Sequence, residues 1–147
     1  MSAWTQDDAK RFARQGWDAS LQRLRDAWLV PDSEACMVAL YEAVTWARAL
    51  DESLGETRPG RLDILNAVRF ARNRALHGLV LLVEPQLQGR LSDIYTDTYG
   101  VLTWVHFDQV DRPASEHYDE KGALAFEHFF EMKPVLDTML EVDSSLI

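Results

Sequence analysis

The chain has 147 residues, a formal net charge of −9, and 47% hydrophobic residues. This length suits one hydrophobic core and is short for two, so we expect a single domain over residues 1–147. The 15 Trp, Tyr and Phe residues exclude a disordered chain, and the acidic balance excludes broad, nonspecific affinity for nucleic acid.

The amino terminus has neither the basic start nor the apolar stretch of a secretory signal. The longest strongly apolar run, Leu79 to Val83, is too short to span a bilayer. These features predict a cytoplasmic protein without membrane association. The single cysteine, Cys36, excludes an intrachain disulfide, and its apolar neighbours predict a buried, unreactive thiol.

Helical spacing predicts two long helices in the first third of the chain. Thr5, with Asp8 three residues later, is typical of a helix N-cap, and apolar residues then recur at helical spacing, which predicts a helix over 5–29. Asp32 or Ser33 caps the second helix. We expect its apolar face to contain Cys36, Met37, Leu40, Tyr41, Val44, Ala47 and Leu50.

A loop over 55–60 leads to a third predicted helix, which Pro59 helps to start. Its apolar positions run from Leu62 to Leu79, toward the break at Glu84-Pro85. The pattern then weakens, and the β-branched and aromatic residues between 99 and 107 predict a short hairpin or extended segment. Trp104 in this segment favours half-buried packing, with stacking on a base as the alternative.

After a second break at Arg112-Pro113, the spacing of Ala123, Phe126, Phe129 and Phe130 predicts another helix. Lys133-Pro134 restarts or kinks a final helix that continues through Leu140. The sequence therefore predicts an all-α fold, an antiparallel bundle of four to five helices, with a short β-hairpin or extended insertion around 93–110.

The charge is unevenly distributed along the chain. Between Arg58 and Val83 there are five arginines and one acid, Asp63, so this segment carries +4 and the rest of the chain −13. A solvated charged face is the ordinary explanation for such a cluster. The difference in sign nevertheless makes the third helix the first place to look for an anionic ligand.

Arg72 is the most unusual residue of the third helix. On a helical wheel Leu65, Val68, Leu76 and Leu79 fall within about 40° of it, which places Arg72 at the centre of the apolar stripe. A guanidinium stays charged at ordinary pH, so burial is costly unless an anion, a carboxylate or a second chain meets it. Asp51, on the inner side of the second helix, is the candidate carboxylate. Their pairing as an internal brace is the structural alternative to a functional site.

The same wheel places Arg69, Asn73 and His77 along one flank of the helix, beside Arg72. The segment Arg72-Asn73-Arg74-Ala75-Leu76-His77 resembles the signature of HEPN-domain ribonucleases, in which an arginine and a polar residue, often asparagine, precede a histidine on a bundle helix. The resemblance covers this motif closely and the remaining chain through helical architecture. A similar Arg-to-His spacing, Arg112 to His117, falls in a proline-containing segment where no such site is expected.

The resemblance implies a homodimer in which two motif helices build one composite RNA-cleaving site without a metal or another cofactor. His77 would be the general acid/base, Arg72 would stabilise the transition state, and Asn73 would orient the phosphate or His77. Arg69 and Arg74 would bind the RNA backbone, with Asp51 behind Arg72. The setting would be a toxin–antitoxin, defence or stress system, with an antitoxin or other regulatory protein as partner.

The sequence contains no motif typical of another class of enzyme. His106, His117 and His128 lack metal-ligand spacing, and the chain contains no Gly-rich phosphate loop. The second hypothesis is a non-catalytic helical-bundle dimer, a protein-binding or regulatory module whose acidic surfaces contact a basic protein. His77→Ala distinguishes the two hypotheses, since only the enzyme needs the imidazole.

Overall fold

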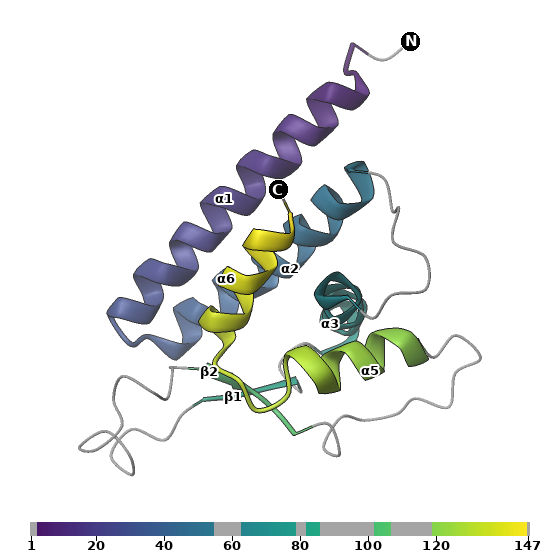
Figure 1. The fold of residues 1–147 in the computed structure, drawn as a ribbon. Coiled ribbons are helices and arrows are strands. Elements are labelled where there is room, and N and C mark those ends of the chain that lie inside the picture. The colour runs from purple at the N-terminus through teal and green to yellow at the C-terminus, as the bar shows by residue number, and fades with distance from the viewer. Residues whose placement is uncertain (1–2, 55–62, 79–81, 86–101, 107–118, 147) are drawn as a thin grey trace.

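The computed structural model describes residues 3–54, 63–78, 82–85, 102–106 and 119–146, and its elements are shown in Figure 1. The helices are α1 (Gln6–Leu29), α2 (Ser33–Ser53), α3 (Ile64–Gly78), α5 (Glu120–Phe129) and α6 (Val135–Ser145), and the strands are β1 (Val83–Pro85) and β2 (Leu102–Trp104). This arrangement confirms the predicted helical bundle with a small antiparallel insertion. No helix within the described ranges has the length and apolar character needed to cross a membrane.

Helices α1 and α2 form a long antiparallel pair (Figure 1). Thr5 caps α1 in a reciprocal capping box with Asp8, and the Asp32 side chain caps α2 by accepting a hydrogen bond from the Ala35 amide. Gly16 allows the close approach of the two helices, because a Cβ at this position would lie 2.2 Å from the indole of Trp46. Both helices were therefore correctly predicted, including their caps.

The buried face of α2 differs from the predicted apolar face at three positions. Tyr41 is exposed, whereas Ala39 and Ala43 are buried. The buried arc is shifted because α2 packs against α1 along one side and against α3 along another. Two neighbours on different sides bury a different set of residues from the one expected for a helix with a single apolar face.

Helix α3 begins two residues later than its apolar pattern suggests. The Asp63 side chain accepts a hydrogen bond from the Leu65 amide at 2.8 Å, and the Asp63 carbonyl accepts one from the Asn66 amide. The loop predicted over 55–60 lies outside the described residues. In the bundle α3 packs against both α2 and α5, so it has neighbours on two sides (Figure 1).

The two strands pair antiparallel, with Val83 opposite Trp104 and Pro85 opposite Leu102. Extended structure was correctly predicted at 102–104. Its partner strand, however, comes from the segment after α3, so the hairpin is not confined to 93–110. Residues 93–101 and 107–110 of the predicted insertion lie outside the described part of the chain.

The α5–α6 connection extends this small sheet. Met132 has a φ of 61°, a left-handed conformation, and its amide donates to the Trp104 carbonyl at 3.1 Å. The Trp104 amide in turn donates to the Lys133 carbonyl at 3.1 Å. The break predicted at Lys133-Pro134 is thus confirmed as a turn between two helices, and α6 continues beyond Leu140 to Ser145.

An aromatic cluster connects the sheet to α5 and α6. Trp104 stacks on Phe130 with ring centroids 4.7 Å apart and contacts Phe126 edge-on at 5.7 Å. Its indole Nε1 donates to the Thr138 hydroxyl at 2.7 Å, so the buried polar atom is satisfied. Trp104 is fully buried, which confirms packing as its role and leaves no exposed ring face for a base.

Candidate functional site on helix α3

The buried arc of α3 is wider than a single apolar stripe. Its described buried residues are Ile64, Leu65, Ala67, Val68, Phe70 and Ala71. At about 100° per residue these positions span a broad arc whose centre lies roughly 90° from Arg72. Arg72 is half-buried at the edge of that arc. The prediction that Arg72 lies at its centre is therefore wrong, because two neighbouring helices cover α3 and move the buried face away from this residue.

Arg72 has one polar contact in the described part of the protein. Its Nη1 lies 3.4 Å from the Oδ1 of the adjacent Asn73, which is a long hydrogen bond at an exposed position. Among the described residues no carboxylate lies within ion-pair distance of this guanidinium, so the brace between Arg72 and Asp51 is not formed there. Asp51 instead accepts from Arg48 Nη1 at 3.3 Å, within the same helix.

The backbone of α3 is helical through Gly78 and therefore includes His77. His77 follows Asn73 by four residues, about one turn, and follows Arg72 by roughly 7.5 Å along the helix axis. The side chain of His77 lies outside the described atoms. The predicted row of Arg69, Asn73 and His77 thus stands on one continuous helix, with Asn73 exposed and Arg69 half-buried.

Arg69 is held by a carboxylate from another helix. Its Nε and Nη2 donate to the two oxygens of Asp119 at 2.9 and 3.1 Å, and its Nη1 donates to Asn66 Oδ1 at 2.9 Å. This bidentate ion pair fixes the Arg69 guanidinium in one orientation. Arg69 was predicted to bind RNA, but in this structure its charge is opposed by Asp119 and its contacts connect α3 to the start of α5.

Asp119 is also the N-cap of α5, and its Oδ1 accepts a hydrogen bond from the Gly122 amide at 2.9 Å. Burial alone would raise the pKa of Asp119. The hydrogen bonds from Arg69 and the Gly122 amide, with the charges of Arg69 and Arg48, outweigh burial and hold the pKa below its usual value. Gly122 leaves room for this arrangement, because a Cβ there would lie 2.3 Å from Asp119 Oδ2.

Asp119 and Arg48 belong to this charged group, although no sequence pattern around the third helix predicts either of them. An acid just before a helix is explained by its cap role alone, and Asp119 does cap α5. Its pairing with Arg69, 50 residues earlier in the chain, depends on how α5 packs against α3. No periodicity within either helix carries that information.

Arg74, the other arginine predicted to bind RNA, is half-buried, with its Cζ 5.5 Å from the centroid of the Phe70 ring. At this distance a guanidinium is attracted to the face of an aromatic ring. The three arginines of α3 therefore have different environments: a carboxylate at Arg69, a neighbouring amide at Arg72 and a ring at Arg74.

Among the residues that the structure describes, the other chemically reactive groups form no competing centre. Cys36 is buried, as predicted, and burial together with the nearby charge of Asp32 raises the pKa of its thiol to about 11. His106 Nε2 lies 3.7 Å from a Glu131 carboxylate oxygen. Within the described ranges, no group of three or more His, Cys, Asp or Glu side chains is arranged to hold a metal ion.

We expect Asp119→Ala to lower the free energy of unfolding by about 2 kcal/mol. The substitution removes a helix cap and leaves Arg69 without its carboxylate, and both partners are 22–26% exposed, which reduces the loss below that of a fully buried pair. Asp119→Asn should lose less, because asparagine also caps helices. Urea denaturation of the two variants beside the wild type measures the difference.

The same pair makes stability depend on pH. A carboxyl whose pKa is lower in the folded protein stabilises the fold above the unfolded pKa, here 3.8, and this contribution disappears as the pH falls through the folded value. The stability gap between wild type and Asp119→Asn should therefore be constant near neutral pH and narrow below about pH 4. A gap that is independent of pH down to pH 2 would exclude an ionised Asp119 as the source.

Comparison of the chain with protein-family models, with curated proteins and with solved structures finds no match.

Proposed function

We propose that this protein is a metal-independent endoribonuclease of the HEPN type, which cleaves RNA at a composite site across a homodimer. The observation that carries the proposal is the state of Arg72. Its guanidinium is half-exposed at the edge of α3 and is not opposed by any described carboxylate, whereas Arg69, one turn earlier, is fully engaged by Asp119. A guanidinium that carries a permanent charge and no ion-pair partner is suited to bind a phosphate through two of its N–H groups.

The groups around Arg72 suit phosphodiester cleavage. The guanidinium stabilises negative charge that develops on the phosphate oxygens, and the Asn73 amide, already 3.4 Å from Arg72, orients either the phosphate or His77. His77, one turn beyond Asn73, exchanges a proton with the ribose 2′-hydroxyl or with the leaving oxygen. Asp119 supports the site indirectly, because it holds Arg69 and thereby fixes α3 against α5.

A second copy of the chain completes the proposed site. One α3 helix supplies one Arg72 to stabilise charge and one His77 to carry out both proton transfers. Two α3 helices related by a twofold axis present a pair of each, with the exposed Asn73 edges facing one another. The half-buried Arg72 then lies close to the interface, where exclusion of water strengthens its attraction to phosphate.

The charge of the chain restricts the substrate. A net charge of −9 repels long RNA, so the proposed enzyme acts on a narrow cytoplasmic target such as one exposed loop. Within a toxin–antitoxin, defence or stress system, an antitoxin or other regulatory protein restrains the activity. The alternative function, a protein-binding module without catalysis, is favoured by a separate surface between α1 and α2.

The test compares three chains expressed in cells: wild type, His77→Ala and Arg112→Ala. Total RNA should be degraded by wild type and by Arg112→Ala, but not by His77→Ala. Arg112 is a matched control because it begins the second Arg-to-His spacing of the sequence. Equal RNA integrity in all three strains would contradict the proposed ribonuclease activity. A strictly monomeric protein in light scattering would contradict a composite site between two subunits.

A further inference from the structure

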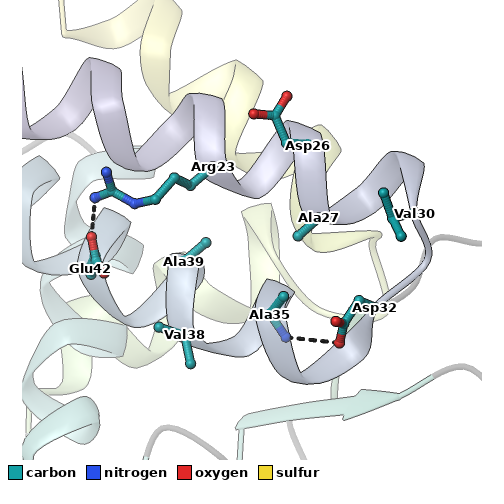
Figure 2. Close-up of a pocket in the computed structure, with 9 residues that line it drawn as sticks. All are labelled: Arg23, Asp26, Ala27, Val30, Asp32, Ala35, Val38, Ala39 and Glu42. Carbon is teal, nitrogen blue, oxygen red and sulfur yellow. Dashed lines mark hydrogen bonds and ion pairs between the residues drawn. The ribbon is translucent and has the colours of Figure 1, made fainter.

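A groove of about 540 Å³ lies between the end of α1 and the beginning of α2 (Figure 2). Residues at helical spacing line it from both sides: Arg23, Asp26 and Ala27 from α1, Ala35, Val38, Ala39 and Glu42 from α2, and Val30 and Asp32 from the connection between them. The two stripes run from residue 23 to 30 and from 35 to 42, so each spans eight residues and roughly 10 Å along the helix direction. The groove therefore follows the direction of the two helices.

The surface of the groove is apolar and accessible. Val30 and Val38 are 74% and 62% exposed, and Leu29, beside Val30, is also exposed. The alanines between the two helices have short side chains that allow another helix to approach closely. Together these features resemble the apolar stripe to which a third helix packs in a three-helix bundle.

The charges around the groove are unbalanced. Three acids and one arginine line it, and the arginine is already used: Arg23 pairs with Glu42 across the two helices at one end, as the dashed line in Figure 2 shows. Asp26 accepts a hydrogen bond from Gln22 and Asp32 caps α2, but neither carboxylate forms an ion pair with a described cation. Two negative charges therefore flank the exposed valines.

This combination identifies the chemistry of the occupant. Leucine or isoleucine side chains would cover Val30 and Val38, while lysine or arginine side chains beside them would meet Asp26 and Asp32. A second copy of this chain is a poor occupant, because twofold pairing would bring two acidic rims together on molecules that each carry −9. We propose that the α1–α2 groove docks a cationic amphipathic helix of a partner protein.

The test uses three synthetic peptides of about 18 residues, roughly five helical turns, whose binding is measured by fluorescence anisotropy at about 0.15 M salt. The first is an amphipathic helix of leucine, alanine and lysine. The second has glutamate in place of lysine, and the third is a scrambled form of the first with the same charge. The first should bind at least roughly tenfold more tightly than either of the others.

Variants of the protein then locate the binding. Val38→Arg places a bulky like charge in the groove and should weaken binding of the first peptide at least roughly tenfold. Leu124→Arg, at a 57% exposed position on α5, is the matched control and should change binding less than about twofold. The pair Asp26→Asn and Asp32→Asn should weaken binding without loss of the α2 cap, since asparagine also caps helices.

The results that would overturn the proposal are specific. Equal binding of the scrambled peptide would show attraction to an acidic surface in general, and wild-type binding by Val38→Arg would place the peptide elsewhere. A dimer seen by light scattering that Val38→Arg dissociates would identify a second copy as the occupant. Because none of these variants lies on α3, the outcome is independent of RNA cleavage.

Discussion

Arg72→Met should lower the rate of RNA cleavage at least about 100-fold, the usual loss when one donor to a transition-state oxyanion is removed. Methionine retains the length and apolar character of the stem but has neither charge nor N–H donors. Because Arg72 has no ion-pair partner among the described residues, the free energy of unfolding should change by less than about 0.5 kcal/mol. Single-turnover cleavage of a radiolabelled RNA, together with urea denaturation, measures both effects.

Two controls separate the chemistry of Arg72 from general electrostatic attraction. Arg72→Lys keeps the charge but cannot bind a phosphate in a bidentate way. Its cleavage rate should therefore lie between those of Arg72→Met and the wild type. Arg74→Met removes an equal charge from the same helix and should mainly raise KM, because the proposed role of Arg74, which stacks on Phe70, is affinity for the RNA backbone and not the chemical step. Equal loss of kcat in both methionine variants would contradict a distinct role for Arg72.

Trp104→Ala should destabilise the fold by about 4 kcal/mol, one of the largest effects available to a single substitution. The indole is fully buried and contacts Phe126 and Phe130, which belong to or adjoin α5. Its Nε1 also donates to Thr138 of α6. Removal of this one side chain therefore leaves a cavity where the sheet and two helices meet. Chemical denaturation followed by circular dichroism measures the loss.

Trp104→Phe is the matched control for this prediction. Phenylalanine fills much of the cavity and keeps an aromatic face toward Phe130, so about 1–2 kcal/mol should be lost. The Thr138 hydroxyl still donates to the Val135 carbonyl at 2.7 Å and is not left without a partner. Loss of less than about 1 kcal/mol in Trp104→Ala would mean that the cluster relaxes to close the cavity.

The local features of the fold were predictable from the sequence. Local sequence patterns predict three of these features: the Thr5 cap, the Asp32 cap and the turn at Lys133-Pro134. Each depends on residues that are only a few positions apart in the chain. Cys36 was correctly predicted to be buried for the same reason, since its apolar neighbours recur at helical spacing. The α3 row from Arg69 to His77 likewise follows from helix periodicity alone, and its helical backbone is confirmed.

The tertiary structure decided how these helices use their faces. The sequence by itself determined that α3 is an amphipathic helix with a polar row beside an apolar arc. Only the packing of the helices determined that α2 and α5 both cover α3. This packing places Arg72 at the edge of the buried arc and brings Asp119 into an ion pair with Arg69. Periodicity reports which residues share a face, whereas the partner of a charge depends on contacts between segments that are far apart in the chain.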